Sequence, residues 1–132
     1  MIYLDSCALV KLVLPEPETP ALEAFLHAQG EDKHVTAALA RTEIVRAVRR
    51  SGAHARFLDV AADLLRRLTR VQVTEELLDR AGRLPDRQLR SLDAVHLAAA
   101  LTLGDALTVL VTYDQRLTRA ARDQDLPLAA PS

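Results

Sequence analysis

The sequence predicts an α/β domain with a short parallel sheet flanked by helices on both faces. Short apolar runs alternate along the chain with longer segments of helical spacing, which is typical of strands joined by helical crossovers. The clearest apolar runs are residues 107–111 and 2–4. The chain has 132 residues, with no internal repeat and no linker, so we expect one domain over residues 1–132.

Five segments have the length and composition of strands. The last of them contains Pro127, which an edge strand tolerates because its N–H side faces solvent. The expected strands are residues 2–5, 33–36, 71–73, 107–112 and 126–128.

Seven segments are expected to be helical, because caps or helix breakers bound them or because their apolar residues recur with helical spacing. Ser6 could cap the first of these helices and Ser91 offers a cap to the sixth. Pro15, Gly30 and Pro85 follow the first, second and fifth. The expected helices are residues 6–14, 19–29, 37–50, 53–68, 75–84, 91–103 and 115–123.

Composition favours a soluble, folded protein. Apolar residues make up 49% of the chain, and 17 basic residues nearly balance 18 acidic ones, which argues against disorder and against a simple basic nucleic-acid binder. We therefore expect no direct DNA binding from this chain alone. Cys7 is the only cysteine, so no intramolecular disulfide can form. With no signal peptide and no long apolar span, a cytoplasmic protein that makes no use of a membrane is expected.

Four acidic residues occur where the predicted fold would direct carboxylates to one point. Asp5 and Asp114 follow predicted strands, and ligands of such folds bind beyond the carboxyl ends of the strands. Glu43 and Asp93 lie in apolar helical segments, where a carboxylate is costly to bury unless a cation or hydrogen bonds compensate it. Taken singly, Asp5 and Asp114 are equally well explained as helix N-caps. Together, the four would suit a hard divalent cation.

Four segments of the chain carry a family pattern in a fixed order. They read YLDSCALVK, TEIVRA, LDAVHLA and LVTYDQRL, at residues 3–11, 42–47, 92–98 and 110–117. With them the chain resembles PIN-domain nucleases and, among these, the VapC-type toxins of bacterial toxin–antitoxin pairs. The resemblance implies a PIN-like fold, a metal-dependent endoribonuclease that hydrolyses RNA phosphodiester bonds, a cognate VapB-type antitoxin and a homodimer.

The resemblance also implies the residues of the site. It assigns the metal to four carboxylates and marks two hydroxyl neighbours that help to place metal-bound water or phosphate. The hydroxyl neighbours are Ser6 and Thr112, and the metal ligands are Asp5, Glu43, Asp93 and Asp114.

The chemistry of RNA hydrolysis agrees with this assignment. Mg²⁺, or Mn²⁺ as its substitute, can activate water and neutralise charge on a phosphodiester. Mg²⁺ prefers oxygen ligands. The chain has no His/Cys ligand set of the kind that zinc requires.

Two other classes of protein share parts of the pattern. A catalytically silent PIN-like binding module would not need all four acids. An aspartyl phosphatase would need an acid where Cys7 stands, and a receiver domain would need a late lysine, whereas no lysine follows Lys33. Neither phosphate-handling fold explains Asp93.

A few further residues are candidates for lesser roles. His96 lies one turn after Asp93 and is better explained as a structural histidine than as a catalytic one, and Cys7 as a packing residue. Arg46 and Arg50 share a helix face and could contact RNA phosphates, although a solvated face explains them equally well. Arg116 is a modest candidate for the same role.

The partner is expected on the helices near residues 37–68. Phe57, Leu64 and Leu65 form an apolar stripe there that exceeds what one core-facing side requires. A partner segment that carries Arg or Lys could also enter the acidic pocket.

Overall fold

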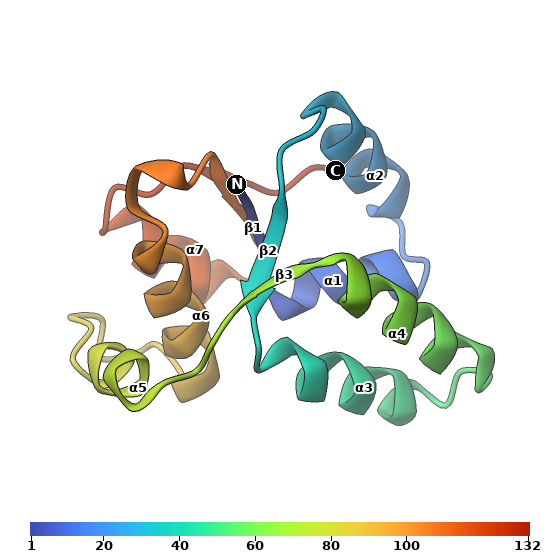
Figure 1. Cartoon of the computed structure of the whole chain (residues 1–132), viewed down its shortest axis with the longest axis horizontal. Helices are drawn as coiled ribbons and strands as arrows, with labels where there is room; N and C mark the ends of the chain where they lie inside the picture. Colours follow the sequence, from blue (N-terminus) through green and yellow to red (C-terminus); the bar gives the residue numbers. More distant parts are fainter.

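The computed structural model describes residues 1–132 as a five-stranded sheet between two layers of helices (Figure 1). All four strand pairings are parallel, and the strand order is β3-β2-β1-β4-β5. The predicted fold class is therefore confirmed. The strands are β1 (Ile2–Leu4), β2 (His34–Ala37), β3 (Thr69–Val71), β4 (Val109–Val111) and β5 (Leu128–Ala129).

Helices from the two halves of the chain cover different faces of the sheet (Figure 1). The first four helices enclose one apolar core, and the last three enclose the other. One layer consists of α1 (Ser6–Val13), α2 (Thr19–Ala28), α3 (Ala40–Ser51) and α4 (Arg56–Arg67), and the other of α5 (Glu75–Gly82), α6 (Ser91–Thr102) and α7 (Gln115–Arg122).

The central strands contribute alternate residues to the two cores. Ile2 and Leu4 of β1 belong to the core under α1–α4, and Tyr3 belongs to the core under α5–α7. This alternation follows from the two-residue repeat of a strand, in which successive side chains point to opposite faces. Each central strand is buried on both sides, which explains its continuous apolar sequence.

Several element boundaries differ from the sequence prediction. The helix expected from residue 37 begins at Ala40, because Ala37 still pairs with Val71 as the last residue of β2. The third strand lies at residues 69–71, two residues earlier than expected. A single 3-10 turn, Gly104–Ala106, was not predicted.

Both predicted serine caps are wrong. Ser6 is the first residue of α1, and the Asp5 carboxylate caps this helix by accepting a hydrogen bond of 2.9 Å from the Ala8 N–H. Ser91 is likewise the first residue of α6, and Arg90 precedes it without a capping side-chain bond.

The register of β1 and β4 sets the position of the candidate site. Leu4 pairs with Val111 at the carboxyl ends of these neighbouring strands. Asp5 and Thr112 follow directly, and the Asp5 N–H donates to the Val111 carbonyl at 3.2 Å. The sheet therefore directs the next residues of both strands to the same edge, as expected for a parallel fold.

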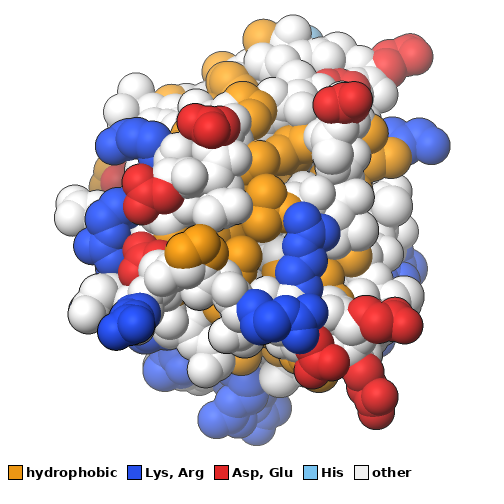
Figure 2. All heavy atoms as spheres, turned by 90° about the vertical axis from the view of Figure 1, so that its left-hand side faces the viewer, with side chains coloured by type: hydrophobic (Ala, Val, Ile, Leu, Met, Phe, Trp, Pro, Cys, Tyr) orange, Lys and Arg blue, Asp and Glu red, His pale blue; other side chains and the backbone are white.

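The layer of α5, α6 and α7 leaves some apolar surface exposed. Figure 2 shows this side of the molecule, where hydrophobic side chains form a band between charged ones. Leu78 of α5 and Leu92 of α6 are 47% and 51% exposed.

None of the helices is both long enough and apolar enough to cross a membrane.

Candidate active site

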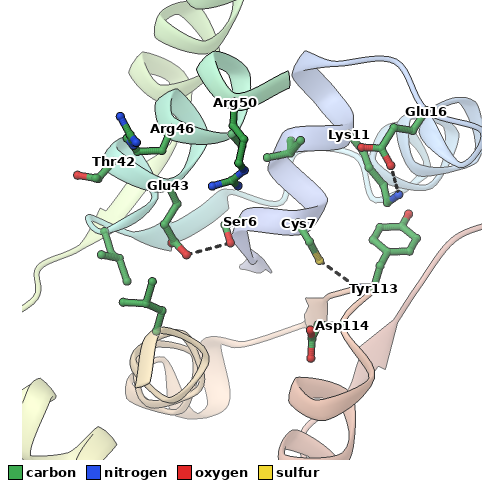
Figure 3. A pocket seen from close by; sticks show the side chains of 14 residues that line it. Ser6, Cys7, Lys11, Glu16, Thr42, Glu43, Arg46, Arg50, Tyr113 and Asp114 are labelled. Carbon is green, nitrogen blue, oxygen red and sulfur yellow. Dashed lines mark hydrogen bonds and ion pairs between the residues drawn. The ribbon is translucent and has the colours of Figure 1, made fainter. Parts of the chain in front are cut away.

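A cavity of about 760 Å³ opens at the carboxyl ends of β1 and β4 (Figure 3). Its lining includes the starts of α1 and α7 and one side of α3. Carboxylates and cations both line it, and Figure 3 shows them intermixed, with Glu43 on the same helix as Arg46 and Arg50 and with Glu16 paired to Lys11. The charged residues of the lining are Glu16, Glu43, Asp114, Lys11, Arg46 and Arg50.

Asp5 is the most deeply buried of the four predicted acids, with 3% of its surface exposed. Its carboxylate accepts hydrogen bonds from the Thr112 hydroxyl at 2.5 Å, from the Cys7 thiol at 2.9 and 3.2 Å, and from the Ala8 N–H. Burial nevertheless raises the pKa of Asp5, because loss of hydration outweighs these bonds. The carboxylate is therefore a helix cap whose negative charge is costly to bury.

Cys7 is a hydrogen-bonding thiol. Burial and the adjacent Asp5 charge raise the pKa of Cys7 to about 12, so its sulfur stays protonated at neutral pH. It donates to Asp5 and accepts from the Tyr113 N–H at 3.2 Å. The expectation that Cys7 is a packing residue is therefore incomplete, because its thiol also donates and accepts hydrogen bonds.

Glu43 reaches the site from α3 and is held at both of its oxygens. Its Oε1 lies 2.6 Å from His96 Nε2, and its Oε2 accepts from the Ser6 hydroxyl at 3.1 Å. The other ring nitrogen of His96, Nδ1, lies 2.8 Å from the Tyr3 hydroxyl. His96 is 1% exposed, so the chain of contacts runs from the core to the cavity wall.

Asp93 and Asp114 share one arginine. Arg90 lies 3.3 Å from Asp93 and 3.5 Å from Asp114, and Asp114 also caps α7 through the Leu117 N–H. Burial raises the pKa of Asp93, the neighbouring charge of Asp114 adds to the rise, and Arg90 opposes it. These two acids are close enough to repel each other, which is the behaviour expected of members of a cation site.

The two predicted hydroxyl residues contact the carboxylates. Thr112 donates to Asp5 and accepts from the Asp114 N–H at 3.1 Å, so it ties two predicted ligands together. Ser6 donates to Glu43 and lines the cavity. Both hydroxyls thus orient acids in this structure.

The donor set suits a hard divalent cation in its chemistry. All four acids offer oxygen, and the raised pKa values of Asp5 and Asp93 mark charge that their surroundings leave uncompensated. Nevertheless, no three His, Cys, Asp or Glu side chains lie close enough together to hold one ion. Arg90 is the cation that contacts Asp93 and Asp114 here, and a bound ion would have to displace it.

The sequence prediction missed two residues that contribute contacts at the site, Tyr3 and Arg90. Tyr3 was seen only as part of a strand, although a buried tyrosine hydroxyl usually needs a polar partner. Arg90 precedes Asp93 by three residues, a spacing at which helical side chains meet. Arg116 is exposed, makes no ion pair and does not line the cavity.

The comparisons with known proteins agree on one family. The model of the PIN domain matches residues 2–123. Ribonuclease VapC46 of Mycobacterium tuberculosis is 44% identical over 131 residues, which cover 99% of this chain and 98% of that protein. Ribonuclease VapC47 of the same species is 42% identical over 139 residues, with 99% and 97% covered.

Two solved structures have the same fold. The crystal structure of Mycobacterium tuberculosis VapC20, described as a Sarcin-Ricin loop cleaving toxin, aligns with a TM-score of 0.74 at 19% identity and covers 91% of this chain and 95% of that one. VapBC2 from Rickettsia felis, bound to a DNA fragment from its promoter, aligns with a TM-score of 0.76 at 16% identity and full coverage of both chains.

Proposed function

This chain belongs to the PIN-domain family and, within it, to the VapC ribonucleases, and from that premise we propose that it hydrolyses RNA in the cavity beyond β1 and β4 with the help of a divalent cation. The observation that carries the proposal is geometric: Asp5 and Asp114 follow the neighbouring strands β1 and β4, and Arg90 contacts both Asp114 and Asp93. In support, burial raises the pKa values of Asp5 and Asp93. Carboxylates left uncompensated at that edge of an α/β fold are typical of functional sites.

Asp5, Glu43, Asp93 and Asp114 would hold the ion, Mg²⁺ or Mn²⁺. The chemistry that a bound ion supplies is a lower pKa for water and neutralisation of charge on the phosphodiester. The chain's own residues orient this site. Thr112 fixes the Asp5 carboxylate, and Ser6 and His96 fix that of Glu43. Arg46 and Arg50, which line the cavity from the same helix as Glu43, can bind RNA phosphates.

Nuclease assays with and without metal test the proposal. The purified protein should cleave RNA with Mg²⁺ or Mn²⁺ and be inactive in EDTA. Asp5→Asn and Asp93→Asn should each lower kcat by roughly 100-fold or more, since each removes a charged ligand of the cation that would stabilise the transition state, while keeping size. Asp59→Asn, on the exposed side of α4, is the matched control and should keep full activity.

The alternative, a catalytically silent binding module, predicts a different outcome. A folded wild-type protein that leaves RNA intact in every divalent cation would favour it. Cleavage at the wild-type rate by either site variant would instead show that the metal-site assignment is wrong.

We also propose a small inhibitory protein partner of the VapB type, as the family membership suggests. The acids of the cavity would attract a partner segment that carries Arg or Lys. The apolar stripe expected to receive this partner is less free than predicted. Leu65 is buried, and Phe57 and Leu64 pack against the core of the chain itself. Growth arrest on expression, relieved by co-expression of the neighbouring small gene, would support this partner.

A homodimer is part of the same proposal. Leu78 and Leu92 are exposed apolar candidates for the contact between subunits. Light scattering of the purified chain measures its mass directly, and a monomer at micromolar concentration would contradict the dimer.

A further inference from the structure

A buried chain of polar contacts crosses the molecule from one helical layer to the other. Tyr3 comes from β1, His96 from α6 and Glu43 from α3, and their contacts are 2.8 and 2.6 Å long. This series of polar contacts ends at the Ser6 hydroxyl on the cavity wall, which donates to Glu43, as the dashed line in Figure 3 shows.

For an ionised Glu43 and a neutral His96, hydrogen-bond accounting gives the direction of these contacts. An ionised carboxylate can only accept, so His96 Nε2 must carry the hydrogen that is donated to Glu43. In a neutral imidazole Nδ1 is then an acceptor, and the Tyr3 hydroxyl must donate to it. The tyrosine therefore selects the tautomer in which the histidine points its N–H at Glu43.

The imidazole is packed within the core and held at both ring nitrogens. Residues 94–100 of α6 are all buried, and His96 is 1% exposed. Tyr3 meets the ring edge-to-face, with centroids 5.9 Å apart and planes at 78°. A side chain locked in this way can fix the position of a carboxylate that would otherwise rotate freely in a cavity.

On the basis of the proposed function, we propose that His96 is a positioning residue: its Nε2–H holds the Glu43 carboxylate in the orientation that receives the divalent cation, and Tyr3 holds His96 in the donating tautomer. Ser6 holds the second oxygen of Glu43. Partners that orient a ligand carboxylate commonly change metal affinity by 10- to 100-fold. A histidine needed only for packing would affect stability alone.

Mn²⁺ binding, measured by calorimetry without RNA, tests the proposal independently of activity. His96→Leu fills the space but cannot donate, and it should weaken Mn²⁺ binding by roughly 10-fold or more. His96→Gln can place an amide N–H near the position of Nε2 and should recover most of the affinity. Tyr3→Phe keeps the ring in place and should give a smaller loss, because it removes only the control of the tautomer.

A double-mutant cycle identifies the route of the effect. In a Glu43→Gln background, His96→Leu should cause little further loss of Mn²⁺ affinity, because the group that it positions has already lost its charge. An equal loss in both backgrounds would overturn the proposal. So would a His96→Leu protein that melts earlier but binds Mn²⁺ as tightly as the wild type.

Failure of the proposed function has a different signature. If the wild type does not bind Mn²⁺ at all, the cation site itself is wrong. If His96→Leu does not fold, His96→Gln and Tyr3→Phe still decide the matter: loss of affinity in His96→Gln equal to that in Glu43→Gln, together with no effect of Tyr3→Phe, would exclude a donating histidine.

Discussion

Arg46 and Arg50 lie one turn apart on α3, and both line the cavity that Glu43 and Asp114 enter (Figure 3). Both are exposed, and neither makes an ion pair within the chain. Free guanidinium groups at this spacing can contact successive phosphates of one strand. The two arginines are therefore the best candidates for the groups that hold RNA over the acids.

Arg46→Gln and Arg50→Gln should each weaken RNA binding by roughly 10-fold, because a hydrogen bond to a charged group contributes about 1.5 kcal/mol. The change should appear in KM more than in kcat, and the salt dependence of binding should become shallower. Arg49→Gln is the control, since Arg49 is exposed on the same helix but does not line the cavity. Equal losses in all three variants would indicate a general charge effect instead of a site.

The residue scale also shows what sequence could reveal about the site. Asp5 and Asp114 were visible both as N-caps and as site acids, and the structure has both in capping positions at the functional edge. The contact between Tyr3 and His96 was not visible, because these two residues lie 93 residues apart along the chain. Local spacing identifies acids and caps, whereas a long-range hydrogen bond depends on how the layers pack.

At the scale of elements, tertiary pairing overrode local preference at the start of α3. Ala37, Ala38 and Leu39 are good helix formers, so the sequence predicted a helix from residue 37. Pairing with β3 keeps Ala37 extended, and the Ala38 N–H bonds to the Val71 carbonyl at 2.8 Å. Local propensity reveals neither the strand order nor this hydrogen bond. The start of α4 was also predicted three residues too early, at residue 53 instead of Arg56, whereas the starts of the remaining helices agree with prediction.

The C-terminus of α3 gives a stability prediction. Gly52 follows this helix with φ +71°, a left-handed conformation that costs an L-residue about 1 kcal/mol. Gly52→Ala should therefore lower the free energy of unfolding by ~1 kcal/mol. Gly82 ends α5 without positive φ and has open space at its Cβ position, so Gly82→Ala should not destabilise. Chemical denaturation of both variants measures the difference, and an equal loss in the two would refute the conformational explanation.

At the scale of the whole molecule, two acids of the proposed cation site lower the stability of the fold. The folded state raises the pKa values of Asp5 and Asp93, so it binds their protons more readily than the unfolded chain does. Each such group lowers stability at neutral pH, and this penalty disappears as pH falls through the folded pKa towards the unfolded value near 4. Asp32 and Asp86 act in the opposite direction, because hydrogen bonds and ion pairs lower their pKa values. The free energy of unfolding therefore contains contributions that rise with pH and contributions that fall with pH. Comparison with a variant is needed to isolate the contribution of the site.

The variant Asp93→Asn isolates the contribution of the site to the pH dependence of stability. At pH 7 without metal this variant should be more stable than the wild type by ~1 kcal/mol, the usual gain when a functional site gives up a strained group. The ion pair that it loses is with the largely exposed Arg90 and contributes little. The advantage should shrink as pH falls towards about 4, because the wild-type carboxyl then becomes neutral as well. Thermal unfolding across this pH range measures the difference.

The wild type and Asp93→Asn also test whether Asp93 takes part in binding a cation. Mg²⁺ or Mn²⁺ should raise the Tm of the wild type, because an ion that binds only the folded state stabilises it, and should raise that of Asp93→Asn much less. Since the four acids come from four separate stretches of the chain, such a shift would reflect the assembled sheet edge and no single helix. If both proteins gain equally and Asp93→Asn is the less stable without metal, Asp93 is a structural acid outside the shared cation site.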